Sequence, residues 1–259
     1  TASVASGARG PLRELDPSDV AFWKTIRNAT TSFDGKWFAY VLAPNEGDAE
    51  VVIRPTADGG KEWRFPIGEP PAAAGFGAVG EPPLAISGDG KWALFTTYPK
   101  SVEAKKLRKD KKPLQNGAVL VNLATGEKRD FERVRRATFA GERPSWVVMH
   151  RYNAEGTNAA EMILADLRSG TLSTVGGVGE FALDDSGTWL AWSSETKDLV
   201  GNGLQLRNLA TDVVRTLDSE KALYRRLAWS DSGLALSALR GRPDSAASDT
   251  AYAVVGWPN

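Results

Sequence analysis

The stretch Ser32-Phe33-Asp34-Gly35-Lys36-Trp37-Phe38-Ala39-Tyr40 returns in altered form along the chain. Two clear copies follow it, SGDGKWALF at residues 87–95 and DDSGTWLAW at residues 184–192. A shorter copy, SDSGLAL, lies at residues 230–236, and a degenerate one begins with FAGE at residues 139–142. Repeats of this length are typical of proteins built from similar units set side by side. The repeat is therefore the first guide to the fold, ahead of the secondary structure suggested by any single segment.

Each copy combines a tight turn with a strand. Asp-Gly or Ser-Gly supplies the positive-φ residue that a hairpin turn requires. The apolar run after the turn, rich in Trp, Leu and Val, is typical of β-structure. The Trp that follows two residues after the glycine is expected to pack between neighbouring sheets, at positions Trp37, Trp92 and Trp189. The anchor glycines recur every 46 to 55 residues, at Gly35, Gly90, Gly141, Gly187 and Gly233.

A second turn lies inside most repeats. It reads NLATG at residues 122–126, DLRSG at 166–170 and NLATD at 208–212, and DGG at 58–60 takes its place in the first repeat. Two hairpins per repeat make one four-stranded antiparallel sheet, which is the blade of a β-propeller. The sequence therefore predicts an all-β propeller.

The blade limits follow from these turns. We expect four complete blades at residues 27–67, 79–131, 134–175 and 178–217, and a fifth that begins near Leu223. The fifth runs out at residues 253–257, where its third strand is expected. Propellers close with about 4 to 8 blades, and an unfinished blade leaves an open sheet edge. We therefore expect a piece of a longer protein, or self-association through the open edge.

Residues 1–26 are expected to form an N-terminal extension with a short helix before the propeller at 27–259. Asp16 suits the cap of this helix and Pro17 its first position. One helical face is expected to consist of Val20, Trp23 and Ile26. The small, polar residues 1–7 lack an initiator Met, so we expect a cleaved signal peptide and a periplasmic or secreted protein.

Composition excludes several classes of partner and chemistry. Lys and Arg number 32, as do Asp and Glu, so no overall charge attracts nucleic acid or an anionic membrane. The chain has no Cys and a single His, His150, in a strand-like run where we expect a structural role. No G-x-S-x-G nucleophile motif occurs. The aspartates Asp110, Asp184 and Asp185 lack the spacing of a calcium loop. The sequence predicts no catalytic, cofactor-binding or metal-binding residues.

Two further segments invite a functional reading. Residues 75–80 match G-x-G-x-x-G, but Pro82 and Pro83 follow, so we expect a plain loop rather than a dinucleotide site. Residues 100–112 carry seven Lys and Arg. We expect a solvated hairpin extension of the second blade, with a contact to an acidic partner or another domain as the alternative.

The chain resembles the N-terminal propeller of the prolyl oligopeptidase family of serine peptidases, and most closely its exported bacterial dipeptidyl and acylaminoacyl peptidase-like members. The resemblance covers nearly the whole chain as an ordered set of segments. These are residues 22–26 (FWKTI), 32–40, the basic insertion ending KKP at 111–113, 120–126 (LVNLATG), 224–229 (YRRLAW) and 250–253 (TAYA).

The resemblance implies a propeller of seven or eight blades that caps a C-terminal α/β-hydrolase domain, which supplies the Ser, Asp and His. The propeller restricts access to short peptides. That hydrolase is absent from this chain. Dipeptidyl peptidases hold the substrate amine with paired glutamates on the propeller. No Glu-Glu pair occurs here, and Glu155 is the only glutamate considered as a candidate to bind the substrate amine in its place.

Two hypotheses follow. The preferred one is a non-catalytic propeller that packs on, and gates access to, a serine peptidase domain. It requires a G-x-S-x-G domain downstream of Asn259 in the parent gene. The alternative is a stand-alone propeller that serves as a protein-interaction scaffold, which requires a natural stop codon near residue 259 and a stable oligomer covering the open edge.

Overall fold

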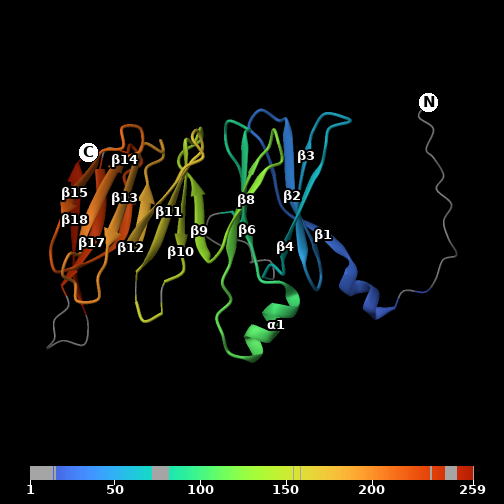
Figure 1. Cartoon of the computed structure of the whole chain (residues 1–259), viewed down its shortest axis with the longest axis horizontal. Helices are drawn as coiled ribbons and strands as arrows, with labels where there is room; N and C mark the ends of the chain where they lie inside the picture. The colour runs from blue at the N-terminus through green and yellow to red at the C-terminus, as the bar shows by residue number, and fades with distance from the viewer. Residues whose placement is uncertain are drawn as a thin grey trace.

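The computed structural model describes residues 14, 16–71, 82–153, 155–157, 159–233, 235–242 and 250–258. It confirms the all-β fold, with antiparallel blades set side by side in chain order (Figure 1). The first blade comprises β1 (Lys24–Thr31), β2 (Trp37–Pro44), β3 (Ala49–Pro55) and β4 (Trp63–Gly68). The second comprises β5 (Leu84–Ile86), β6 (Trp92–Thr97), β7 (Gly117–Asn122) and β8 (Lys128–Phe131).

The third and fourth blades share a strand. The third comprises β9 (Val134–Phe139), β10 (Trp146–Arg151), β11 (Ala160–Asp166) and the first half of β12 (Leu172–Leu183). The second half of β12 begins the fourth blade, with β13 (Trp189–Ser194), β14 (Gly203–Asn208) and β15 (Val214–Asp218). Both pairings of β12 change register beside Val178, so this strand passes from one blade to the next without a break. The fifth blade comprises β16 (Leu223–Trp229), β17 (Ala235–Arg242) and β18 (Ala251–Pro258).

The recurring turns share one pattern of hydrogen bonds. In the first turn the Ser32 hydroxyl donates to Asp34 at 2.6 Å and accepts from the Trp37 amide at 3.0 Å. Ser87, Asp89 and Trp92 repeat this arrangement with the same two distances. In the fourth blade the carboxylate of Asp184 replaces the serine and accepts from the Trp189 amide at 2.6 Å. The repeated sequence is therefore a self-contained turn.

Four apolar cores lie between consecutive blades. Val51 and Ile53 of the first blade, for example, pack against Val119 and Val121 of the second. As expected, the repeated tryptophans are partly buried against these cores, Trp37 in the first, Trp92 in the second and Trp189 in the fourth. Burial of large apolar side chains supplies most of the stabilisation of such a fold.

The stack of blades is open among the described residues. None of the four cores joins the first blade to the fifth, and the two blades lie at opposite ends of Figure 1. The outer face of the fifth blade exposes Tyr252 (46%) and Val254 (77%). Each end of the stack therefore has a blade with a neighbour on one side only.

A short helix precedes the first blade and begins at Pro17, as expected, but the expected apolar face does not form. A 3-10 helix spans Pro17–Phe22, and β1 begins two residues later. Ile26 lies in β1 opposite Leu42, so strand pairing removes it from the helix. Val20, Trp23 and Ile26 are all exposed and form no buried face.

The basic insertion at residues 100–112 also differs from the expected hairpin extension. Instead of a hairpin, α1 (Ser101–Lys109) lies between β6 and β7. The side chain of Ala104 is buried, and the Ser101 amide donates to the Asp48 carboxylate at 2.7 Å. The predicted Gly75–Gly80 loop lies outside the described residues. Neither helix in the described part of the chain has the length and apolar character that a membrane crossing requires.

Candidate functional site

The single histidine has a structural environment. His150, in β10, is 1% exposed, and its Nε2 lies 3.0 Å from the carbonyl of Val178 in β12. A guanidinium nitrogen of Arg135 lies 3.2 Å from Nδ1. Because Arg is only a donor, Nδ1 is the acceptor and Nε2 carries the proton. Burial lowers the pKa of His150, and the positive charges of Arg135 and Arg136 lower it further, although the bond to Val178 opposes them.

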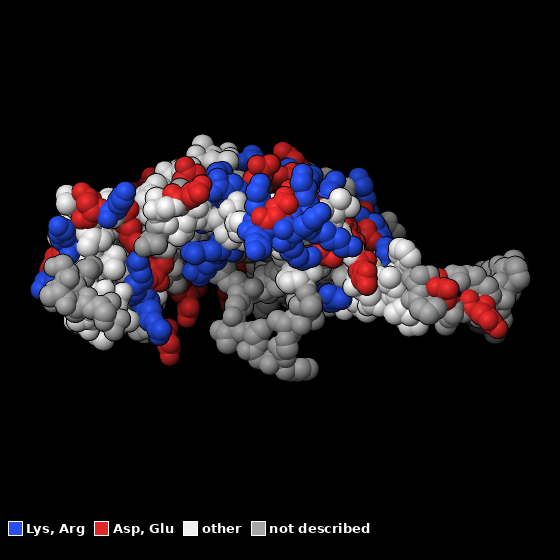
Figure 2. All heavy atoms as spheres, turned by 90° about the horizontal axis from the view of Figure 1, so that it is seen from below, with Lys and Arg blue, Asp and Glu red and all other residues white. Residues whose placement is uncertain are grey.

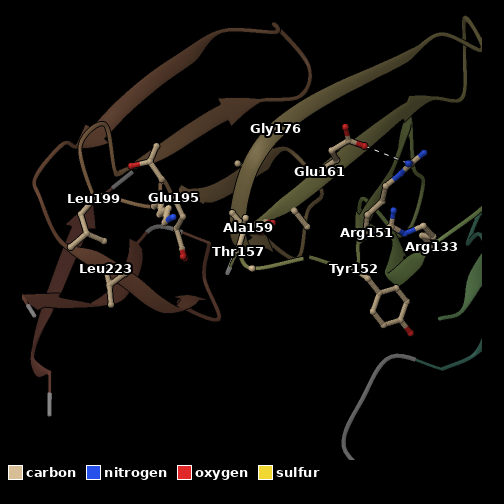
Figure 3. Close-up of a pocket in the computed structure, with 15 residues that line it drawn as sticks. Arg133, Arg151, Tyr152, Thr157, Ala159, Glu161, Gly176, Glu195, Leu199 and Leu223 are labelled. Atoms are coloured by element: carbon tan, nitrogen blue, oxygen red, sulfur yellow. Dashed lines mark hydrogen bonds and ion pairs between the residues drawn. The ribbon is translucent and has the colours of Figure 1, made fainter. Parts of the chain in front are cut away.

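A pocket of about 690 Å³ lies where the strand connections of the third and fourth blades meet the start of the fifth. Its polar side chains include Arg133, Arg151, Tyr152, Glu161 and Glu195. In Figure 3 the arginines and Tyr152 lie at one end, Leu199 and Leu223 at the other, and Glu195 between them. This volume is in the range of small-ligand sites.

Two arginines reach the pocket from adjacent backbone segments. Arg151 ends β10 and pairs in register with Val134, the first residue of β9. Arg133 precedes Val134, and its carbonyl accepts from the Tyr152 amide at 2.9 Å. Arg133 adopts a left-handed backbone conformation, with φ of 58°. Residues other than Gly, Asn and Asp rarely adopt this conformation, and it often occurs at functional positions.

The Gln115 side chain and the backbone N–H of Asn116, both just before β7 of the second blade, fix this end of the pocket. The Nε of Arg133 donates to Gln115 at 3.0 Å, and the hydroxyl of Tyr152 accepts from the Asn116 amide at 3.2 Å. Arg133 also lines a second pocket, of about 720 Å³, beside α1. Figure 2 looks at the face from which α1 projects and shows Lys and Arg side chains gathered there.

The two acidic side chains of the pocket are both paired. Glu161 lies 3.4 Å from a guanidinium nitrogen of Arg151. Glu195, which is 8% exposed, accepts both terminal nitrogens of Arg225, one of them at 3.1 Å. Glu195 is therefore fully engaged, whereas Glu161 is held by one long contact and its side chain is 56% exposed.

The charge balance of the pocket is positive. Arg133 and Lys197 line it, and among the described residues neither has an acidic partner within 4.0 Å. The Nε of Arg151 is buried and has no acceptor there. The pocket thus carries a surplus of positive charge, which favours the binding of an anion.

The amino-acid sequence alone does not reveal this site. The arginines lie 18 residues apart, and only the pairing of β9 with β10 brings them together. Glu155, the stand-in considered for amine binding, is exposed in the turn beside the pocket and is not among its lining residues. A cue was present in Arg133-Val134-Arg135-Arg136, a basic run at the start of a predicted strand.

Within the described ranges no group of three or more His, Cys, Asp or Glu is placed to hold a metal ion. His150 has no hydroxyl nucleophile among its hydrogen-bond partners there; these are Arg135 and the Val178 carbonyl. A Ser-His pair for acyl transfer needs such contact.

No protein-family model and no curated protein sequence matches the chain. Solved structures do. The β-propeller domain of the Trilobed protease from Pyrococcus furiosus is 13% identical, with a TM-score of 0.47 over 91% of this chain and 69% of that one. TolB from Acinetobacter baumannii is 14% identical, with a TM-score of 0.37 over 84% of this chain and 51% of that one.

A third similar structure is the acylaminoacyl peptidase from Pyrococcus horikoshii, which is 12% identical with a TM-score of 0.45. The match covers 88% of this chain but 37% of the peptidase. The chain thus spans about half of the TolB protein and little more than a third of this peptidase. Likenesses this remote decide nothing about function, and the propeller assignment rests on the order of the strands and on the four cores between blades.

Proposed function

We propose that this chain is the non-catalytic propeller of a serine peptidase of the prolyl oligopeptidase family. It packs on an α/β-hydrolase domain and restricts access to short peptides. The observation that carries the proposal is the ordered series of family-like segments, four of which fall on defined elements of the first, second and fifth blades. These are residues 32–40 on the turn before β2, 111–113 just after α1, 120–126 on the turn after β7 and 224–229 on β16.

The arrangement of the described residues supports a binding and gating role. His150 is buried with an arginine and a carbonyl as partners, which leaves it unsuited to act as a catalytic base. The pocket beside Arg133 and Arg151 is open to a ligand and lies on the face of the strand connections. We assign recognition to this chain and bond cleavage to the hydrolase.

The gene and the purified chain provide the test. We expect the reading frame to continue past Asn259 into a domain with a G-x-S-x-G motif. The 259-residue chain alone is expected to leave short chromogenic peptides intact. A stop codon at residue 260, or turnover by the chain alone, would contradict the proposal.

A second candidate, a scaffold that binds other proteins, is favoured by the exposed outer face of the fifth blade. Tyr252 and Val254 lie there on β18, an apolar surface of the kind that binds partners or copies. Sedimentation of the native gene product separates the two candidates. The scaffold requires a stable oligomer that Val254→Lys dissociates, whereas a monomer with a hydrolase domain favours the peptidase.

A further inference from the structure

The pocket between the third, fourth and fifth blades has more cationic groups than its own acids neutralise. Glu161 engages Arg151, and Glu195 engages Arg225. Arg133 and Lys197 have no acidic partner within 4.0 Å among the described residues. A cavity with surplus cations concentrates anions, and the effect is stronger where the walls exclude water.

The guanidinium of Arg133 is fixed at its Nε, and its terminal nitrogens are available to a ligand. Its Nε donates to Gln115 at 3.0 Å, and its two terminal nitrogens make no hydrogen bond within the described part of the chain. A guanidinium fixed at Nε loses less conformational entropy when it binds, and its terminal nitrogens match the two oxygens of a carboxylate.

Arg151 is incompletely satisfied. Its pair with Glu161 is 3.4 Å long, and the Glu161 side chain is 56% exposed. A partly exposed pair of this length contributes little, so an incoming carboxylate can compete with it. The Nε of Arg151 is buried without an acceptor, so this guanidinium has an unsatisfied donor.

The other end of the pocket combines two leucines with polar and charged side chains, because Glu195, Thr196 and Lys197 lie on the same connection as Leu199. Leu199 and Leu223 lie across from the arginines in Figure 3, with Ala159 on the wall between them. A ligand that fits both ends carries a carboxylate at one end and an apolar group at the other. A short peptide with a free C-terminal carboxylate and an apolar last side chain has this form.

We propose that this pocket binds the C-terminal carboxylate of a short peptide, with Arg133 and Arg151 on the carboxylate and the last side chain directed toward Leu199 and Leu223. The choice of a peptide rests on the proposed function. The choice of a carboxylate rests on the charge and geometry of the pocket alone.

The test is calorimetric titration of the 259-residue chain with Ala-Ala-Leu and with its C-terminal amide. Because the amide lacks the negative charge and presents donors toward the arginines, we expect it to bind at least tenfold more weakly. Arg133→Gln is expected to weaken binding of Ala-Ala-Leu at least tenfold. Arg54→Gln, a matched change on an exposed residue of β3 outside the pocket, is expected to leave it unchanged.

Equal binding of acid and amide, binding of neither, or tighter binding of inorganic phosphate than of the peptide would overturn the inference. The acid–amide comparison uses the unaltered chain, so it decides the matter even where Arg133→Gln impairs folding. A failure here leaves the proposed function standing, since that is tested by the downstream gene sequence and by hydrolysis.

Discussion

Glu195 and Arg225 form a two-point ion pair across the boundary between the fourth and fifth blades. Glu195 directly follows β13, and Arg225 belongs to β16. The Glu195 side chain is 5% exposed and that of Arg225 is 30% exposed. The carboxylate lies over Gly179, where a Cβ atom would overlap it. The glycine in β12 therefore makes room for a charged contact between blades.

We expect Arg225→Met to lower the free energy of unfolding by about 2 to 4 kcal/mol, because it leaves the carboxylate of Glu195 buried without its partner. The double variant Glu195→Gln/Arg225→Met is expected to recover part of this loss, since no uncompensated charge remains. Urea denaturation of the single and double variants measures both values. A single variant as stable as the unaltered chain would show that the pair contributes nothing.

His150 makes the stability of the chain depend on pH. Its pKa is lowered in the folded protein, so the unfolded chain binds the proton more readily. Stability is therefore fully present above the unfolded value of 6.5 and falls as the pH drops through it, by up to about 1.4 kcal/mol per pH unit. The pKa values of the Asp34, Asp166 and Asp198 carboxyls are also lowered. These groups take up protons near and below pH 3.8, so they do not contribute in the range where His150 titrates.

The measurement is the denaturation midpoint between pH 7.5 and 5. We expect His150→Gln to flatten the profile between pH 6.5 and 5, because Gln offers an acceptor to Arg135 and a donor to Val178 without titrating. A slope that persists unchanged in this variant would assign the pH dependence to other groups.

Two equivalent turn glycines are expected to differ in their sensitivity to substitution. Gly35 and Gly187 both have positive φ, 68° and 70°. A Cβ at Gly35 meets nothing within 4 Å, whereas one at Gly187 would overlap the Ala140 carbonyl in the turn of the third blade. Gly35→Ala is therefore expected to cost about 1 kcal/mol for the backbone alone. Gly187→Ala is expected to cost about 3 kcal/mol or more, since two turns must separate.

Thermal unfolding of the two variants compares these losses directly. Equal losses would mean that the turns of neighbouring blades do not pack against each other.

The turn-and-strand repeat was predictable because its signals are local. Ser32, Asp34, Gly35 and Trp37 lie within six residues, and the hydrogen bonds that close the turn join these residues to one another. The Arg133–Arg151 site was not predictable, because it depends on the register between β9 and β10. The helix α1 was not predictable because most of its residues are charged or exposed, and Ala104 is its only buried residue. Ile26 was assigned to a helix because its pairing with Leu42 is not visible in the nearby sequence.

Protection against hydrogen exchange is expected to follow the order of the blades. The third blade packs between two cores, whereas the fifth has a core on one side only. Repeat proteins lose structure most readily at their ends. Amides of Val147–His150 in β10 are therefore expected to exchange at least tenfold more slowly than those of Tyr252–Trp257 in β18. Equal protection would indicate that another surface covers the fifth blade.

The most direct test of the central claim is the specificity constant kcat/KM of the full gene product for peptides of increasing length. A propeller that restricts access to a hydrolase predicts efficient cleavage of peptides of a few residues. It also predicts a loss of at least 100-fold for an unfolded polypeptide that carries the same cleavage site. Equal cleavage of short and long chains, or a gene product without peptidase activity, would contradict it.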